Sequence, residues 1–266
     1  MPAKIFSAST LGFECRLVEV EVDILNGLSS MTIVGLGDAS VQESKERIRS
    51  AIKNSDFDYP RRKKTINLAP ADVRKHGPLY DLPITLGLLV QSGQANQEEL
   101  KETMAFGELS LNGDLRGVAG ILAYTEFAQK SGFKKIIVPH DNGREAAIVK
   151  GIRVIPARNL KALVAYLAGK ECIESPQASD IKAEPESEEG PFFEHIHGHE
   201  YAKRALLIAA AGSHNIIMQG PPGSGKTLLA RALRSILPPL TFEEAIEVTK
   251  LHSIAGKLRT HGSLVQ

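Results

Sequence analysis

The sequence predicts the α/β fold class, with an α+β domain first and the start of a second, P-loop α/β domain after it. Apolar and acidic residues alternate over residues 18–24, which is the pattern of a half-buried strand. Stretches with strand and helix periodicity then alternate along most of the chain. A glycine-rich turn at residues 220–227, between an apolar stretch and a helical one, marks the second domain.

The composition fits a globular protein of about two domains. The chain has 266 residues, of which 42% are hydrophobic and 24% are charged. With 32 basic and 31 acidic side chains, the net charge favours neither nucleic acid nor membrane as a partner. Cys15 and Cys172 lie far apart, so no disulfide framework is indicated. No apolar run reaches the ~18 residues of a membrane span, and we expect a cytoplasmic protein.

An acidic stretch divides the chain. Residues 171–190 carry seven acidic side chains against one lysine, with two prolines and almost no large apolar residue. Such a composition is typical of a solvated, flexible linker, although an acidic run can also bind a partner. The sequence therefore predicts a first domain at residues 1–170, a linker at residues 171–190 and a second domain at residues 191–266.

Periodicity and turn residues place the elements of the first domain. Ser40 and Glu43 have the spacing of a capping box for a helix over residues 40–53. Asn112 and Gly113 predict the turn of a hairpin over residues 108–116. The remaining expected strands are residues 31–34, 65–68, 135–138 and 152–155, and the remaining helices are residues 81–91, 121–130, 144–150 and 160–167.

The second domain contains a phosphate-binding motif in its expected context. A helix over residues 200–211, a strand over residues 215–219 and a helix over residues 226–236 surround the turn, and another helix begins at residue 242. The turn matches G-x-x-x-x-G-K-[ST] at every position. Its residues are Gly220, Pro221, Pro222, Gly223, Ser224, Gly225, Lys226 and Thr227.

These residue types suit a nucleoside triphosphate. Glycines let consecutive backbone N–H groups point at phosphate oxygens, next to the positive end of a helix. Lys226 is expected to contact the β- and γ-phosphates, and the Thr227 hydroxyl is expected to complete the shell of a Mg²⁺ ion. We therefore expect ATP and Mg²⁺ as cofactors, with Thr227 as the metal-linked residue.

Hydrolysis needs an acidic residue that positions Mg²⁺ or water, and none is visible after the motif. Glu243, Glu244 and Glu247 follow a helical pattern and predict a solvated face. We assign no catalytic residue within these 266 residues. We expect the ATPase module to continue beyond Gln266 and the 266 residues by themselves to be inactive.

Four separated blocks resemble the ComM/YifB family of magnesium-chelatase-like AAA+ ATPases, and the resemblance covers essentially the whole chain. They are TIVGLGDASVQESKERIRSAIKNS, INLAPADVRKHGPLYDLPITLGLL, GELSLNGDLRGVAGILA and GHEYAKRALLIAAAGSHNIIMQGPPGSGKTLLARALRSILPPLT. The resemblance implies a Lon-protease-like first domain followed by an AAA+ module. In that family the chain continues with an acidic Walker B strand, sensor residues, an arginine finger and a lid.

The resemblance also implies a function. The family is similar to ComM-type helicases, in which a hexameric ring uses ATP to move DNA junctions during homologous recombination of incoming DNA. Two other functions stay open: an ATPase subunit of a magnesium-chelatase-type complex, and a non-catalytic nucleotide-gated scaffold. The Lon-like domain argues against a dedicated chelatase motor.

Lon-type proteases carry a nucleophilic serine after Gly-Pro and a lysine base after the hairpin. Here Leu79 follows Gly77 and Pro78, and Leu122 stands at the expected lysine position. Because both catalytic residues are replaced by leucine, we expect a non-proteolytic domain.

The resemblance places Ile196, His197 and Gly198 beside the adenine base. His195, His197 and His199 also form an alternating pattern that could hold a metal ion, but no fourth ligand is near in sequence, so an adenine-adjacent or structural role is favoured.

Two clusters of cations could contact nucleic acid. One is residues 61–64, and the other is the helix face with Lys45, Arg49 and Lys53. A solvated surface is the competing explanation, because no aromatic residues are interleaved for base stacking.

Overall fold

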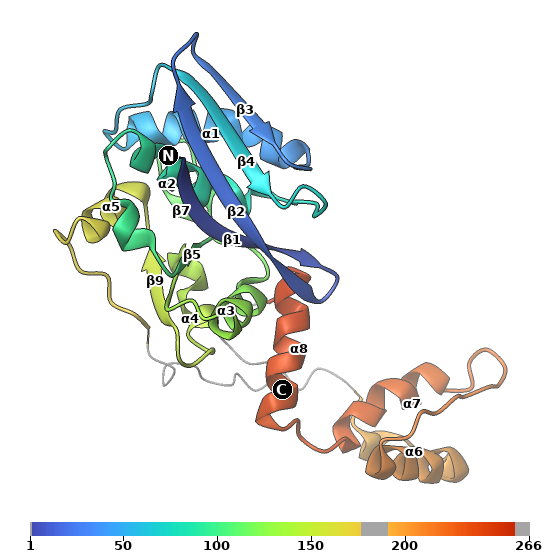
Figure 1. Cartoon of the computed structure of the whole chain (residues 1–266). Coiled ribbons are helices and arrows are strands. Elements are labelled where there is room, and N and C mark those ends of the chain that lie inside the picture. Colours follow the sequence, from blue (N-terminus) through green and yellow to red (C-terminus); the bar gives the residue numbers. More distant parts are fainter. Residues whose placement is uncertain (1, 177–190, 259–266) are drawn as a thin grey trace. The chain divides into compact units, whose positions relative to one another are not determined.

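The computed structural model describes residues 2–176 and 191–258 of the chain (Figure 1). The described residues fall into two compact units. The larger unit consists of residues 2–176 together with residues 248–258, and the smaller unit consists of residues 191–247. Each unit has a hydrophobic core of its own, so we describe them one after the other.

The larger unit alternates strands and helices, as the periodicity predicts. Its strands are β1 (Ala3–Leu11), β2 (Glu14–Leu25), β3 (Ser30–Val34), β4 (Lys63–Ala69), β5 (Thr103–Ala105), β6 (Glu108–Leu109), β7 (Leu115–Arg116), β8 (Lys135–Pro139) and β9 (Arg153–Ala157). Its helices are α1 (Ala39–Asn54), α2 (Asp81–Gln91), α3 (Ile121–Lys130), α4 (Gly143–Ala146) and α5 (Leu160–Leu167). Short 3₁₀ turns are η1 (Pro78–Tyr80), η2 (Gln97–Leu100) and η3 (His140–Asn142).

Seven strands of the described residues form one mixed sheet in the order β3-β4-β2-β1-β5-β8-β9. β1 and β2 pair antiparallel from Ala3 opposite Val22 to Leu11 opposite Glu14, and β2 pairs antiparallel with β4. The pairs β3–β4, β1–β5, β5–β8 and β8–β9 are parallel. Parallel neighbours need a crossover connection, which explains why helices separate the strands in sequence. The predicted α/β class is confirmed.

The core lies between the sheet and α2, which packs on β1 and β2. The alternation in β2 is confirmed, because Val18, Val20 and Val22 are fully buried while the acidic residues between them are not. Gly87 lets α2 approach the sheet closely, since a Cβ at that position would lie 2.5 Å from Val22 Cγ2. Figure 1 shows α1 and α2 together on one face of this sheet.

The buried carboxylate of Asp81 joins α1, α2 and the β6–β7 hairpin. Its two oxygens accept from Arg47, at 2.7 Å from Nε and 3.1 Å from Nη2, and Oδ2 also accepts from the Leu109 backbone at 3.2 Å. Burial raises the pKa of Asp81 to about 6, although Arg47 pulls it in the other direction. The pair fixes the register of the first turn of α2 against α1.

The N-terminus of α1 differs from the prediction. The cap is Asp38, whose Oδ1 accepts from the Val41 backbone at 3.0 Å, and not a box of Ser40 and Glu43. Asp38 is favoured as the cap because its second oxygen also accepts from the Gly77 backbone at 3.1 Å. A tertiary contact therefore shifts the helix start from the position that local spacing indicates.

The helix expected over residues 144–150 is shorter. α4 ends at Ala146, because the chain turns at Gly151, with φ of +85°, to enter β9. Glu145 is buried and accepts from the Leu122 backbone at 2.9 Å and from Asn142 Nδ2 at 2.8 Å. This single turn therefore anchors the start of α3.

The smaller unit is helical in its described residues. It contains η5 (Phe193–His195), α6 (Glu200–Gly212), α7 (Lys226–Ala232), η6 (Leu233–Ile236) and the first residues of α8 (Phe242–Ile254). Ile196, Leu206, Leu229 and Ala232 form its small core. The capping box of the chain occurs here, where Thr241 and Glu244 exchange backbone and side-chain hydrogen bonds at the start of α8.

The strand expected over residues 215–219 does not form. These residues precede the glycine-rich turn as expected but have no strand partner in the described part of the chain, and Ile217 is 95% exposed. A strand needs a neighbour for its backbone hydrogen bonds. The prediction of a strand at this place is therefore wrong for this structure.

Most of the predicted linker at residues 171–190 lies outside the described residues, which resume at residue 191. Residues 171–176 are described and have no regular secondary structure. In the described ranges, no helix combines the length and the apolar character that crossing a membrane requires.

Candidate functional site

The glycine-rich turn of the smaller unit leads directly into α7. Gly223 and Gly225 both adopt positive φ, at +79° and +76°, which only glycine adopts readily. Gly225 is the residue before the first helical residue, Lys226. These two positions explain why the motif needs glycine there, because they curl the backbone just before the helix begins.

Lys226 lies across the mouth of this turn. Its Nζ donates to the backbone oxygens of Gly220 at 2.9 Å and Pro221 at 2.7 Å, and to Ser224 Oγ at 3.2 Å. All three acceptors belong to the turn and none carries a charge. Within the described residues, no carboxylate lies at ion-pair distance from Lys226. An ammonium group held by neutral oxygens is ready to exchange them for phosphate oxygens, which bind it more strongly.

The other polar residues of the motif are placed around the same turn. Ser224 Oγ donates to the Pro221 carbonyl at 2.9 Å, which closes the loop. Thr227 follows Lys226 in the first turn of α7 and is exposed. Pro222 and Gly223 are exposed at the tip. The loop thus presents an ammonium group, a hydroxyl group and glycine backbone on one accessible segment, and this set fits a magnesium-bound polyphosphate.

The segment expected beside adenine lies next to the motif. Ile196 is buried in the core that also contains Leu229 of α7, so packing brings this segment to the loop. His197 and Gly198 are exposed. The neighbour of the loop is His199, because a Cβ at Gly225 would lie 3.4 Å from its Nε2. His199 has φ of +58° and precedes α6.

The histidine pattern does not form a metal site in the described residues, which contain no group of three or more His, Cys, Asp or Glu side chains arranged to hold a metal ion. His195 contacts the Phe192 ring edge-on, with 5.5 Å between ring centroids. Glu243, Glu244 and Glu247 are exposed, as expected for a solvated helix face.

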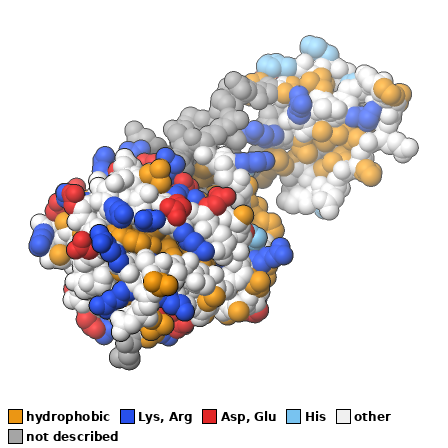
Figure 2. Space-filling view, turned by 90° about the horizontal axis from the view of Figure 1, so that it is seen from above, with side chains coloured by type: hydrophobic (Ala, Val, Ile, Leu, Met, Phe, Trp, Pro, Cys, Tyr) orange, Lys and Arg blue, Asp and Glu red, His pale blue; other side chains and the backbone are white. Residues whose placement is uncertain are grey.

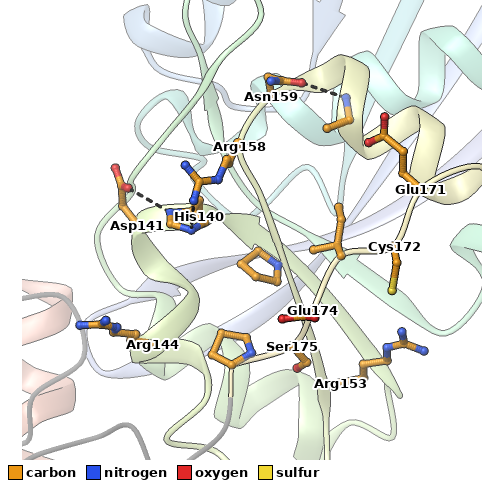
Figure 3. A pocket seen from close by; sticks show the side chains of 14 residues that line it. His140, Asp141, Arg144, Arg153, Arg158, Asn159, Glu171, Cys172, Glu174 and Ser175 are labelled. Atoms are coloured by element: carbon orange, nitrogen blue, oxygen red, sulfur yellow. Dashed lines mark hydrogen bonds and ion pairs between the residues drawn. The ribbon is translucent and has the colours of Figure 1, made fainter.

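The larger unit holds a separate pocket of about 1190 Å³ near the ends of β8 and β9 (Figure 3). Arg144, Arg153 and Arg158 line it, facing Glu171 and Glu174 from the segment after α5. Arg158 Nη2 lies 3.1 Å from His140 Nε2. The pocket is therefore lined by side chains of both charges.

The comparisons with known proteins agree on one family. Family models described as subunit ChlI of Mg-chelatase and as magnesium chelatase, subunit ChlI, match residues 20–142 and 192–266, respectively. The uncharacterized protein YifB of Escherichia coli K12 is 42% identical over 252 residues, which cover 95% of this chain and 49% of that protein. The competence protein ComM of Haemophilus influenzae is 40% identical over 256 residues, covering 95% of this chain and 50% of that protein. The chain belongs to the ComM/YifB family of magnesium-chelatase-like proteins. It spans about half the length of these two relatives.

A more distant likeness concerns the fold of this ComM/YifB-family chain. Lon protease 2 of Bacillus subtilis is 24% identical over 192 residues, which cover 66% of this chain and 31% of that protein. The larger unit is accordingly a Lon-like α/β domain. Leu79 and Leu122, at the positions expected for a Lon serine and lysine, are buried, with exposures of 8% and 1%. Neither side chain offers a nucleophile or a base.

Proposed function

We propose that the smaller unit is the nucleotide-binding part of an AAA+ ATPase that uses ATP and Mg²⁺. The observation that supports this most strongly is the turn of residues 220–227, with two glycines at positive φ and Lys226 held only by uncharged loop oxygens. Such a turn before a helix cradles phosphates through backbone N–H groups. Family membership supports the same reading.

Each motif residue has a role in this proposal. Lys226 exchanges its loop carbonyls for the β- and γ-phosphates, and Thr227 would hold the Mg²⁺ ion that bridges them and neutralises their charge. Ile196, His197 and Gly198 form the side of the adenine pocket, because Ile196 packs in the core with α7. In this proposal, the acidic residues that position Mg²⁺ or water for hydrolysis are not among the described residues.

For the complete gene product, we propose a homo-oligomeric ring, a hexamer, that moves DNA junctions during homologous recombination of incoming DNA. The name of the Haemophilus influenzae relative, a competence protein, supports a role in competence. Because the chain spans about half of that relative, the activity is proposed for the whole protein.

A second candidate is the ATPase subunit of a magnesium-chelatase-type complex. The descriptions of both matching family models favour it, because each refers to the ChlI subunit of that enzyme. Against it, a dedicated chelatase motor is expected to lack a Lon-like domain, although the first of these models matches residues 20–142 of the larger unit. Magnesium insertion into a porphyrin would need partner subunits that hold the porphyrin.

Replacing Lys226 by alanine tests nucleotide binding directly. Lys226→Ala in the complete gene product should weaken ATP binding about 100-fold or more, because the charge-assisted hydrogen bonds to two phosphates are lost. Titration calorimetry with ATP and Mg²⁺ measures this. The melting temperature without nucleotide should stay unchanged, because the lysine contacts only the loop.

The matched control is Arg231→Ala, which removes the same charge from the exposed side of the same helix. Arg231→Ala should bind ATP like the parent protein. If Lys226→Ala binds ATP with parental affinity, the assignment of the loop as the phosphate site is wrong.

A further inference from the structure

The two cation clusters of the larger unit meet in one groove. Lys45, Arg49 and Lys53 lie along one side of α1, and the connection from α1 to β4 lies opposite them. The groove between these segments has a volume of about 640 Å³. We call it the α1–β4 groove, and its main lining residues are Lys45, Arg49, Lys53, Tyr59, Arg61 and Lys64. Figure 2 shows Lys and Arg side chains spread over one face of this unit, with Asp and Glu side chains between them.

The positive charge of the α1–β4 groove is largely uncompensated. Among the described residues, no carboxylate lies at ion-pair distance from Lys45, Arg49, Lys53 or Arg61, and Glu46 is the one acidic lining residue. Some lysines elsewhere on this unit differ, since Lys4, Lys130 and Lys161 each pair with a carboxylate, whereas Lys135 and Lys150 do not within the described ranges. Because repulsion between unpaired cations costs free energy, a cluster without partners in the protein favours an anion from outside.

Lys64 gives the groove a buried cation. The residue is only 1% exposed, and its Nζ donates to the backbone oxygens of Pro60 at 2.8 Å and Arg62 at 2.7 Å. The ammonium also lies 4.6 Å from the centre of the Tyr59 ring. Burial, followed by the charge of Arg49, lowers the pKa of Lys64. A buried ammonium without a carboxylate is costly, and an anion in the groove would supply the missing charge.

The arrangement suits a chain of phosphates better than a single anion. Lys45, Arg49 and Lys53 repeat every four residues, which spaces them about 6 Å apart along the helix axis. Ser30 adds an exposed hydroxyl group, which commonly contacts phosphate oxygens, and Ser29 Oγ accepts from Lys64 Nζ at 3.4 Å. Lys64 already covers a face of Tyr59, so that face is not available for base stacking.

We propose that the α1–β4 groove binds the phosphate backbone of a nucleic-acid strand without reading its sequence. The choice of nucleic acid as the polyanion rests on the proposed DNA-directed function, whereas the need for a polyanion follows from the unpaired cations and the buried Lys64. The site is separate from the nucleotide loop, and its binding does not require ATP.

The test compares two double variants of the complete gene product. Arg49→Ala/Arg61→Ala removes one exposed cation from each side of the groove, and Arg144→Ala/Arg153→Ala removes two exposed arginines from the mixed-charge pocket near β8 and β9. Fluorescence anisotropy measures binding to a labelled single strand and a labelled duplex, without ATP, between about 50 and 200 mM salt. Polyglutamate of similar length is a third probe.

The groove variant should lose about tenfold in DNA affinity, and the slope of log K against log salt should become shallower by about 1.4–1.8, since two phosphate contacts are removed. The arginine control should bind like the parent. Equal losses in both variants, or parental binding by the groove variant, would overturn the proposal. So would binding of polyglutamate with the same affinity and salt slope, which assigns the groove to acidic proteins.

These outcomes are distinct from failure of the proposed ATPase. If the groove variant loses DNA affinity but Lys226→Ala binds ATP as well as the parent does, the inference about the groove holds. The assignment of the nucleotide site is then wrong. If the parent protein binds ATP but no DNA, the assignment of the groove to nucleic acid is wrong and the nucleotide site is unaffected.

Discussion

Asp38 joins two segments of the larger unit through one carboxylate. One oxygen caps α1 at Val41, and the other accepts from the backbone of Gly77, two residues before Leu79. Burial opposes ionisation of Asp38, but the hydrogen bonds from Val41 and Gly77 and the nearby His76 lower its pKa below the usual value. The side chain therefore determines where the helix starts and holds the loop before η1.

Substitutions of Asp38 should separate these two contributions. Asp38→Asn keeps an oxygen for the cap but gives up the contact with Gly77, whereas Asp38→Ala loses both. Because a lost N-cap costs roughly 0.5–2 kcal/mol, we expect the free energy of unfolding to fall in the order parent, Asn, Ala. Urea denaturation of the three proteins measures this order, and an alanine variant as stable as the parent would contradict it.

The pH dependence of Asp38 has a defined sign. Its folded-state pKa lies below the ordinary aspartate value of 3.8, so its contribution to the free energy of unfolding is present above that pH and is lost as the pH falls through the folded-state pKa. The free energy of unfolding should thus fall less steeply below about pH 4 in Asp38→Asn than in the parent. Parallel stability curves for the two proteins over that range would contradict the role assigned to the carboxylate.

At the same scale, the sequence predicted the local geometry of the candidate loop but not every residue that lies beside it. The motif of residues 220–227 depends on local backbone geometry, so its glycines and Lys226 could be recognised from spacing alone. The proximity of His199 to Gly225 could not, because it depends on how Ile196 packs against α7. Asp38 was missed as a cap for the same reason, since its second partner is distant in sequence.

Among the elements, α2 has the tightest contact with the sheet. Gly87 lies over Val22, and a Cβ there would come within 2.5 Å of a Val22 methyl group. Helix propensity alone would favour alanine over glycine by about 1 kcal/mol. Close packing opposes this preference, because overpacking a core costs about 1–3 kcal/mol.

Gly87→Ala should therefore destabilise the larger unit by up to about 2 kcal/mol, in spite of the better helix former. The double variant Gly87→Ala/Val22→Ala should be less destabilised than the sum of the two single variants, because the smaller residue makes room for the new methyl group. Thermal denaturation of all four proteins gives the coupling energy. Additive effects would show that Gly87 is not limited by Val22.

Elements with a strong pattern of their own were predicted, and elements that depend on distant partners were not. β2, α2 and α3 follow clear periodicities, and the structure contains all three. β1 and the three-residue β5 were not predicted, although both lie in the middle of the sheet, since their pairing is decided by strands elsewhere in the chain. Residues 215–219 show the opposite case, an apolar stretch without a strand partner in the described residues.

At the scale of the whole molecule, we propose separate tasks for the two units, nucleic-acid binding and nucleotide binding. The Lon-like unit has leucines where a Lon protease would have its catalytic pair, and it carries the α1–β4 groove. The smaller unit carries the nucleotide loop. A motor needs both tasks to be coupled, because hydrolysis is useful only when it depends on the bound substrate.

The measurement that tests this coupling most directly is ATP turnover by the complete gene product with no DNA, with linear duplex and with a four-way junction. Lys226→Ala controls for contaminating ATPase. We expect a turnover rate that depends on Lys226 and is highest with the four-way junction. An equal turnover rate under all three conditions would contradict the DNA motor and favour the chelatase-type ATPase. An absence of turnover would favour a nucleotide-gated scaffold.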